Sequence, residues 1–206
     1  MSATDSIFYV IVLIMSVVIH EVAHGFMAEY FGDNTARNAG RLTLNPLVHL
    51  DMVGSIFLPA LLVLTHSPFL IGWAKPVPYN PNNLRNEKWG TVAVAAAGVL
   101  ANLFIAIVFG LFIRFTIYSG LPLGFYVITK IIVTTNLILA IFNLVPIPPL
   151  DGSKIFFSLL PRSVYPVTAF VEKYGIILLL IFIVFLSQFL LPIIAFLFHL
   201  ITGLAF

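Results

Sequence analysis

The sequence predicts an all-α membrane protein: a polytopic helix bundle of about five to six transmembrane segments with one re-entrant helix and strand element. Of its 206 residues, 61% are hydrophobic and only 9% are charged. A soluble domain is nearer half apolar and about a quarter charged. No polar stretch is long enough for a separate soluble domain, so residues 1–206 are expected to form one membrane-embedded domain.

Charge and cysteine content exclude several classes of function. The net charge of +2 is too small to indicate nucleic-acid binding. Cysteine is absent, so disulfides are excluded and any zinc must be held by nitrogen and oxygen ligands. The first six residues carry no Lys or Arg, unlike a cleaved signal peptide, so Ile7 onward is expected in the mature protein.

The first helix is expected over residues 6–32, with Asp5 or Ser6 as its cap. At 1.5 Å per residue it would be about 39 Å long, enough to cross a bilayer. A polar loop is expected over residues 33–51, and residues 40–44 within it could form a short strand.

Residues 52–80 predict the re-entrant element. Residues 52–64 are apolar but too short for a full span. Residues 69–78 look extended, and Pro76 and Pro78 stand two apart, a spacing that suits an exposed edge strand or a polyproline stretch. We therefore expect a short helix followed by an extended strand that returns to the same side.

The second half of the chain predicts further spans. A helix over residues 89–118 has a small, closely packing face that includes Gly98 and Asn102. After it come a span over 125–144, an interfacial helix and loop over 153–174, a span over 175–191, and a last apolar segment over 193–206. Three prolines in four residues must unwind the backbone at 146–149.

The most informative motif is His20-Glu21-x-x-His24, inside the first apolar run. On a helix the two histidines share a face, so their imidazoles can converge on one metal ion, with Glu21 close enough to handle a water on that metal. The alternative is a pair of histidines hydrogen-bonded inside a helix bundle.

Asp151 is the natural third ligand. Unwound backbone at membrane depth is tolerated only where it is buried in protein or faces a water-filled cavity, and Asp151 follows the proline-rich break. His49, His66 and Asp51 are the other candidates for the third ligand, although His49 and Asp51 are residues of a kind more often satisfied by loop backbone. His199 is interpreted as structural.

The basic residues predict an orientation. If residues 52–80 turn back, Arg114 and Lys130 fall on one side of the membrane. The other eight then share the opposite, cytoplasmic side, which leaves the N-terminus outside and the site nearer the cytoplasmic face: Arg37, Arg41, Lys75, Arg85, Lys88, Lys154, Arg162 and Lys173.

The chain resembles the site-2 protease family of intramembrane zinc metalloproteases, over roughly residues 7–160. The resemblance rests on His20-Glu21-x-x-His24 and on the motif from Asn143 through Pro146 and Pro148 to Asp151-Gly152. Supporting matches are Gly98-xxx-Asn102 and the runs at 40–46 and 72–78. Val99 departs from the pattern, because many members have proline there, and the extra sensor domains of some relatives are absent from this chain.

The resemblance implies one Zn²⁺ per chain, held by His20, His24 and Asp151 with a water in the fourth position. Glu21 would accept a proton from that water and later deliver a proton to the leaving amine. Asn143 would hold the substrate or its oxyanion, or else form an interhelical hydrogen bond. Asn102 is interpreted as structural.

The resemblance further implies hydrolysis of peptide bonds in or near transmembrane segments of other membrane proteins, in the plasma membrane of a prokaryote. The lipid bilayer is then an obligatory partner, whereas the oligomeric state is left open. Two alternatives are a metal-binding transporter, disfavoured because no internal repeat is seen, and a non-catalytic relative that binds membrane helices, disfavoured by the presence of Glu21.

Overall fold

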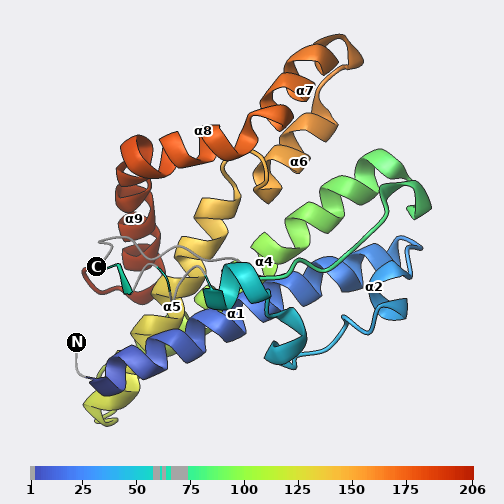
Figure 1. Cartoon of the computed structure of the whole chain (residues 1–206). Coiled ribbons are helices and arrows are strands. Elements are labelled where there is room, and N and C mark those ends of the chain that lie inside the picture. The colour runs from blue at the N-terminus through green and yellow to red at the C-terminus, as the bar shows by residue number, and fades with distance from the viewer. Residues whose placement is uncertain (1–2, 58–60, 62–63, 66–73) are drawn as a thin grey trace.

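In a computed structural model of the chain, the described residues are 3–57, 61, 64–65 and 74–206, and every regular element among them is helical (Figure 1). Four helices are long and apolar enough to cross a membrane: Ser6–Tyr30, Glu87–Thr116, Leu123–Asn143 and Tyr165–Thr202. The chain is therefore a multi-pass membrane protein, as its composition predicts.

Helix α4 (Glu87–Thr116) is the centre of the bundle. It packs against α1 (Ala3–Tyr30), α5 (Leu123–Asn143), α6 (Asp151–Leu159) and α9 (Leu190–Thr202). Small residues line its buried face and allow the neighbouring backbones to approach closely: Gly90, Ala95, Ala97, Gly98, Ala106 and Gly110.

Apolar side chains fill the space between α4, α5 and α9, where Phe198 is fully buried against Ala106 and Leu137. Helices α1 and α5 are joined by a buried hydrogen bond of 2.9 Å, in which the Asn136 amide donates to Ser16 Oγ. In an apolar bundle such a bond satisfies groups that lipid cannot, so it fixes which faces of the two helices meet.

The first three long helices lie within a few residues of their predicted bounds, but the predicted first cap does not hold. Helix α1 already begins at Ala3, so the prediction of a cap at Asp5 or Ser6 was wrong. The helix ends before Gly32, which has a φ of +105° that residues with a side chain rarely adopt. At the start of α4, the Asn86 side chain accepts from the Trp89 N–H at 3.0 Å and caps the helix.

The C-terminal quarter is helical with two changes of direction. Helices α6 and α7 (Tyr165–Lys173) form an arm that projects from the bundle, and α8 (Gly175–Ile181) leads back to α9 (Figure 1). The predicted break at Pro192 was wrong. The irregular turns lie at 182–189 instead, and Pro192 falls in the first turn of α9, where a missing N–H costs no helical hydrogen bond.

The loop after α1 differs from its prediction. It contains the short helices α2 (Thr35–Asn38), η1 (Pro46–His49) and η2 (Met52–Phe57). Residues 40–44 form no strand. The extended segment 74–80 is tied to this loop through the Arg41 side chain and the His49 carbonyl rather than through a ladder.

The predicted re-entrant element, residues 52–80, is described only in part. Half of the predicted strand at 69–78, and part of the helix before it, lie outside the described residues. Its described end belongs to the extended segment 74–80, which runs beside α1 without strand pairing.

A buried carboxylate ties this segment to the end of α1. Asp33 Oδ2 accepts from the Asn80 N–H at 2.6 Å, and Oδ1 accepts from the Asn83 amide at 2.8 Å and from the Thr35 N–H at 3.1 Å. Burial by itself raises the pKa of the Asp33 carboxyl, but these hydrogen bonds outweigh it and hold the pKa below its usual range. The ionised form therefore stabilises the fold.

Asp33→Asn should lower the free energy of unfolding by about 1–3 kcal/mol at neutral pH, because amide nitrogen cannot accept these bonds. Since the folded-state pKa is lowered, the stabilisation is present above the unfolded value of about 3.9 and is lost as the pH falls through the folded value. Thermal melting in detergent should show a steeper acid-side loss for wild type than for the variant. The matched control is Glu87→Gln, at an exposed carboxylate; an equal effect there would contradict the assignment.

Candidate metal centre

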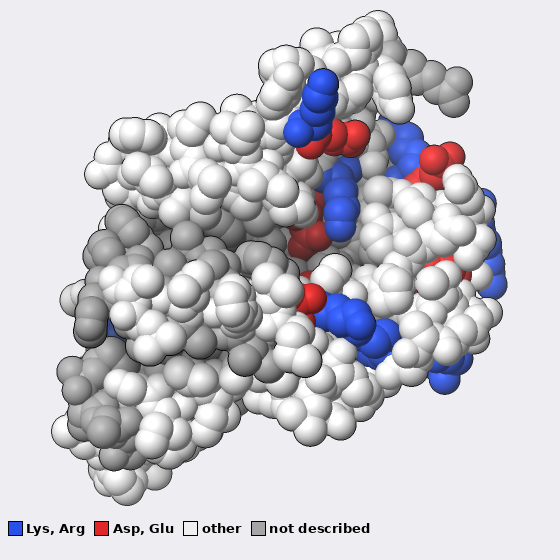
Figure 2. Space-filling view, viewed as in Figure 1, with Lys and Arg blue, Asp and Glu red and all other residues white. Residues whose placement is uncertain are grey.

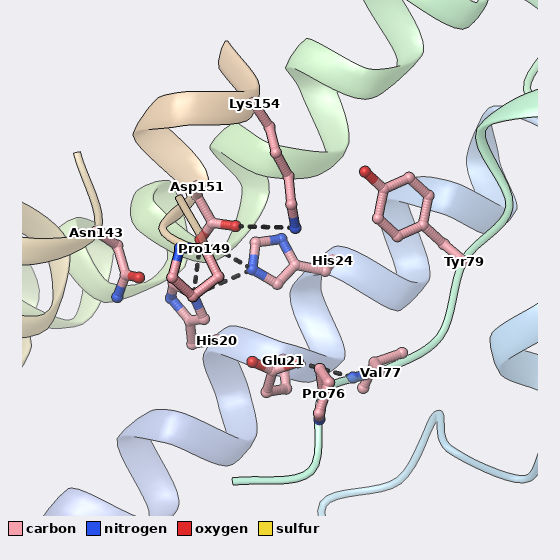
Figure 3. Close-up of a pocket in the computed structure, with 10 residues that line it drawn as sticks. All are labelled: His20, Glu21, His24, Pro76, Val77, Tyr79, Asn143, Pro149, Asp151 and Lys154. Atoms are coloured by element: carbon pink, nitrogen blue, oxygen red, sulfur yellow. Dashed lines mark hydrogen bonds and ion pairs between the residues drawn. The ribbon is translucent and has the colours of Figure 1, made fainter. Parts of the chain in front are cut away.

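Helix α1 presents His20 and His24 on one face, as their four-residue spacing predicts. Both side chains are buried, and their Nε2 atoms lie 3.0 Å apart. Figure 3 shows the two imidazoles turned toward the start of α6.

Asp151, the first residue of α6, completes a three-residue group. Its Oδ2 lies 3.0 Å from His20 Nε2 and 3.2 Å from His24 Nε2. The backbone between α5 and α6 is irregular, as the prolines predict, and this break delivers the carboxylate to the interior. Two motifs 131 residues apart thus meet at one point.

The far sides of the two imidazoles have their own partners. His24 Nδ1 donates to the Val94 carbonyl of α4 at 2.6 Å, so its Nε2 carries the free lone pair. His20 Nδ1 lies 3.3 Å from the Asn102 amide group, whose Oδ1 is buried and has no hydrogen-bond partner among the described residues. With this amide turned end for end, Oδ1 accepts from the His20 Nδ1–H, which leaves Nε2 free to bind a metal.

Glu21 lies beside the histidines. One oxygen of its carboxylate is within 4.8 Å of a ring nitrogen of both His20 and His24. Its Oε2 also accepts from the backbone N–H of Val77, at 2.8 Å. The extended segment 74–80 therefore reaches the centre of the site, which no pattern in the sequence predicts.

A cavity of about 130 Å³ opens over the group. Its lining includes the predicted residue Asn143, whose amide donates to Leu139 of its own helix at 2.9 Å. That bond is not the interhelical one that the sequence left as an alternative. Figure 2 shows acidic and basic side chains gathered around a hollow in the same region.

Lys154 is a lining residue that sequence reasoning did not single out. Its Nζ lies 3.7 Å from Asp151 Oδ1 and 5.5 Å from the centre of the Tyr79 ring (Figure 3). The available signal was its position three residues after Asp151, which puts both on one helix face.

Gly98 of α4 makes room for the histidines. A Cβ at this position would lie 2.6 Å from Cε1 of both His20 and His24. The small helix face predicted from the sequence is therefore a wall of the site as well as a packing surface.

The other candidate ligands lie elsewhere. His49 is buried, with Nε2 2.9 Å from the Thr43 carbonyl, and Asp51 caps the turn at 52–57 by accepting from the Gly54 N–H at 2.7 Å. His199 Nδ1 lies 3.1 Å from the Leu204 carbonyl. Neither His49 nor Asp51 lines the cavity, and neither does His199, which is interpreted as structural from the sequence. His66, the remaining candidate ligand, lies outside the described residues.

Comparison with known proteins gives the family. The family model described as "Peptidase family M50" matches residues 119–186. The chain is 38% identical over 192 residues to "Putative zinc metalloprotease YwhC" of Bacillus subtilis (strain 168), covering 90% of this chain and 81% of that protein. The chain therefore belongs to peptidase family M50, the family of zinc metalloproteases that the two motifs predict.

A second relative is more distant. "Putative zinc metalloprotease Rip2" of Mycolicibacterium smegmatis (strain ATCC 700084 / mc(2)155) is 33% identical over 147 residues. The match covers 68% of this chain and about half, 52%, of that protein. No solved structure matches the chain.

Gly98→Ala should reduce the zinc bound per chain at a fixed low zinc concentration, about 10- to 100-fold in affinity, because the added methyl group displaces both imidazoles. Zinc is measured by elemental analysis after dialysis against a weak chelator. Gly124→Ala is the matched control, since a Cβ there meets no atom within 4 Å. Full zinc binding by Gly98→Ala would contradict the close approach.

Proposed function

We propose that the chain is a zinc-dependent endopeptidase that cuts peptide bonds in or near the transmembrane segments of other membrane proteins, with His20, His24 and Asp151 as the metal ligands. One observation carries the proposal: two imidazole nitrogens and one carboxylate oxygen, from two distant motifs, lie within 3.2 Å of one another.

The donor set fits zinc. Four ligands at about 2.0–2.1 Å in a tetrahedron stand roughly 3.3 Å apart, and the three atoms here are separated by 3.0, 3.0 and 3.2 Å. The partners of both imidazoles, at Val94 and Asn102, suit neutral rings with Nε2 free. Zinc held there supplies Lewis acidity, which polarises the scissile carbonyl and lowers the pKa of water.

The remaining chemistry belongs to side chains of the cavity. Glu21 accepts the proton of the attacking water and passes a proton to the leaving amine nitrogen. The Asn143 amide, at the cavity wall, holds the substrate carbonyl or the oxyanion that forms from it. The C–N bond of the peptide breaks as water adds, so the products are a carboxylate and an amine.

The extended segment supports a mode of substrate binding. A helical substrate hides its carbonyls in internal hydrogen bonds, so it must unwind before its backbone can reach the cavity. Pro76, Val77 and Tyr79 line that cavity. An unwound peptide can lie in extended form along these side chains. The backbone N–H groups of Lys75 and Val77 are already bonded to the His49 carbonyl and to Glu21.

Three contacts support the predicted orientation and the return of residues 52–80 to the same side. The Arg85 N–H donates to the Phe31 carbonyl at 2.8 Å, so α4 starts beside the end of α1. At the other end of the bundle, Arg114 donates to the Leu200 carbonyl and Lys130 lies over the Phe198 ring. The site-bearing end is then cytoplasmic by the excess of basic residues.

The proposal is tested with two variants and one model substrate, a single-span fusion protein with an Asn-Gly pair in its membrane helix. Glu21→Gln should lose cleavage by at least about 100-fold and keep its zinc, because it removes the base but no ligand. Asp151→Asn should bind zinc about 10- to 100-fold more weakly. Cleavage that survives Glu21→Gln, or unchanged zinc binding by Asp151→Asn, would sink the assignment.

Unwinding predicts a preference among substrates. Fusions with a helix-breaking Asn-Gly pair should be cut at least about 5-fold faster than fusions with an unbroken poly-Leu helix, because Gly lowers the cost of opening the helix by roughly 1 kcal/mol or more. Both are compared in one detergent by gel densitometry. Equal rates would mean that unwinding does not limit the reaction.

A further inference from the structure

The segment that reaches Glu21 offers it one amide proton only. Pro76 and Pro78 have no backbone N–H, so Val77 carries the sole donor between residues 76 and 78. That donor meets Glu21 Oε2 at 2.8 Å (Figure 3). A slip of the segment by one residue in either direction would place a proline opposite Glu21 and remove the bond.

Two residues of the loop after α2 hold the segment in this register. The Arg41 guanidinium donates through one nitrogen to the Lys75 carbonyl at 2.7 Å and the Pro76 carbonyl at 3.3 Å. The Lys75 N–H donates to the His49 carbonyl at 2.8 Å. Every one of these bonds involves one of the two residues before Val77, so together they place its N–H.

Arg41 is an unusual residue for such a position. Its side chain is buried, and among the described residues its Nε has no hydrogen-bond partner and no carboxylate pairs with it. Burying a guanidinium without a carboxylate is costly, and an apolar residue would fill the space at lower cost. The hydrolytic chemistry described above does not use Arg41. Its described side-chain bonds go to the segment that contacts Glu21.

We propose that Arg41 is a positioning residue for catalysis: with the His49 carbonyl it fixes the register of 74–77, so that the Val77 N–H anchors one oxygen of Glu21 and leaves the other to take the proton. This inference rests on the proposed function. It assigns no contact between Arg41 and the substrate.

The first test separates positioning from folding. Arg41→Met should lower kcat on the Asn-Gly fusion about 10- to 100-fold with zinc content nearly unchanged, since the metal ligands stay in place. KM should rise as well, because the substrate is proposed to lie along the segment that loses its register. The kcat of Arg41→Lys should lie between that of the wild type and that of Arg41→Met, because an ammonium group cannot donate to both carbonyls equally well. Arg37→Met is the matched control: Arg37 lies four residues earlier, in α2, and pairs with Glu29.

The second test leaves Arg41 in place. Val77→Pro removes the N–H, so it should lower kcat about 10-fold or more below Val77→Ala, which keeps the N–H. The double variant Arg41→Met/Val77→Pro should lose little beyond Val77→Pro alone, within about threefold, because both changes break one contact. Additive losses, or equal rates for the two Val77 variants, would overturn the inference.

The third test does not depend on proteolytic activity. Hydrogen–deuterium exchange at residues 74–80 should speed up about 10-fold or more at Lys75 and Val77 in Arg41→Met, and should stay at the wild-type rate in Arg37→Met. Unchanged exchange in Arg41→Met overturns the inference even when the wild type cleaves. A wild type that binds zinc but does not cleave overturns the proposed function, whereas the exchange difference still reports whether Arg41 holds the segment.

Discussion

The structure depends on one contact, the meeting of Asp151 with His20 and His24 inside an apolar bundle. A carboxylate and two imidazoles at this depth are costly unless they have partners or a metal. The contact joins the first long helix to the break after α5, which lies 131 residues later. The packing of α1, α4, α5 and α6 therefore has to deliver these three side chains to one point.

Helix α4 makes this meeting possible without contributing a ligand. Gly98 lets the imidazoles approach, the Val94 carbonyl accepts a hydrogen bond from His24 Nδ1–H, and the Asn102 amide lies against His20. The residues that set ring orientation and tautomer thus share the small face that packs the bundle. Close packing and metal binding therefore both require small residues on this face of α4.

The helices, the metal group and the family were predictable because they leave local signals. Apolar runs reveal the long helices, and the spacing of His20 and His24 reveals a shared face. The contact between Val77 and Glu21 left no such signal, since a backbone N–H looks the same at every residue but proline. The wrong strand at 40–44 has a related cause: β-pattern residues form a strand only beside a partner.

By itself, the sequence determined that the chain lies in a membrane, where its long helices run and which residue types could hold zinc, because hydropathy and helical spacing are local properties. Only the tertiary structure decided that Asp151 meets the histidines, that Asn102 and Val94 hold the rings, and that Arg41 reaches residues 75 and 76. These contacts join segments far apart in the chain. Their distances follow from how whole helices pack, which no short stretch of sequence encodes.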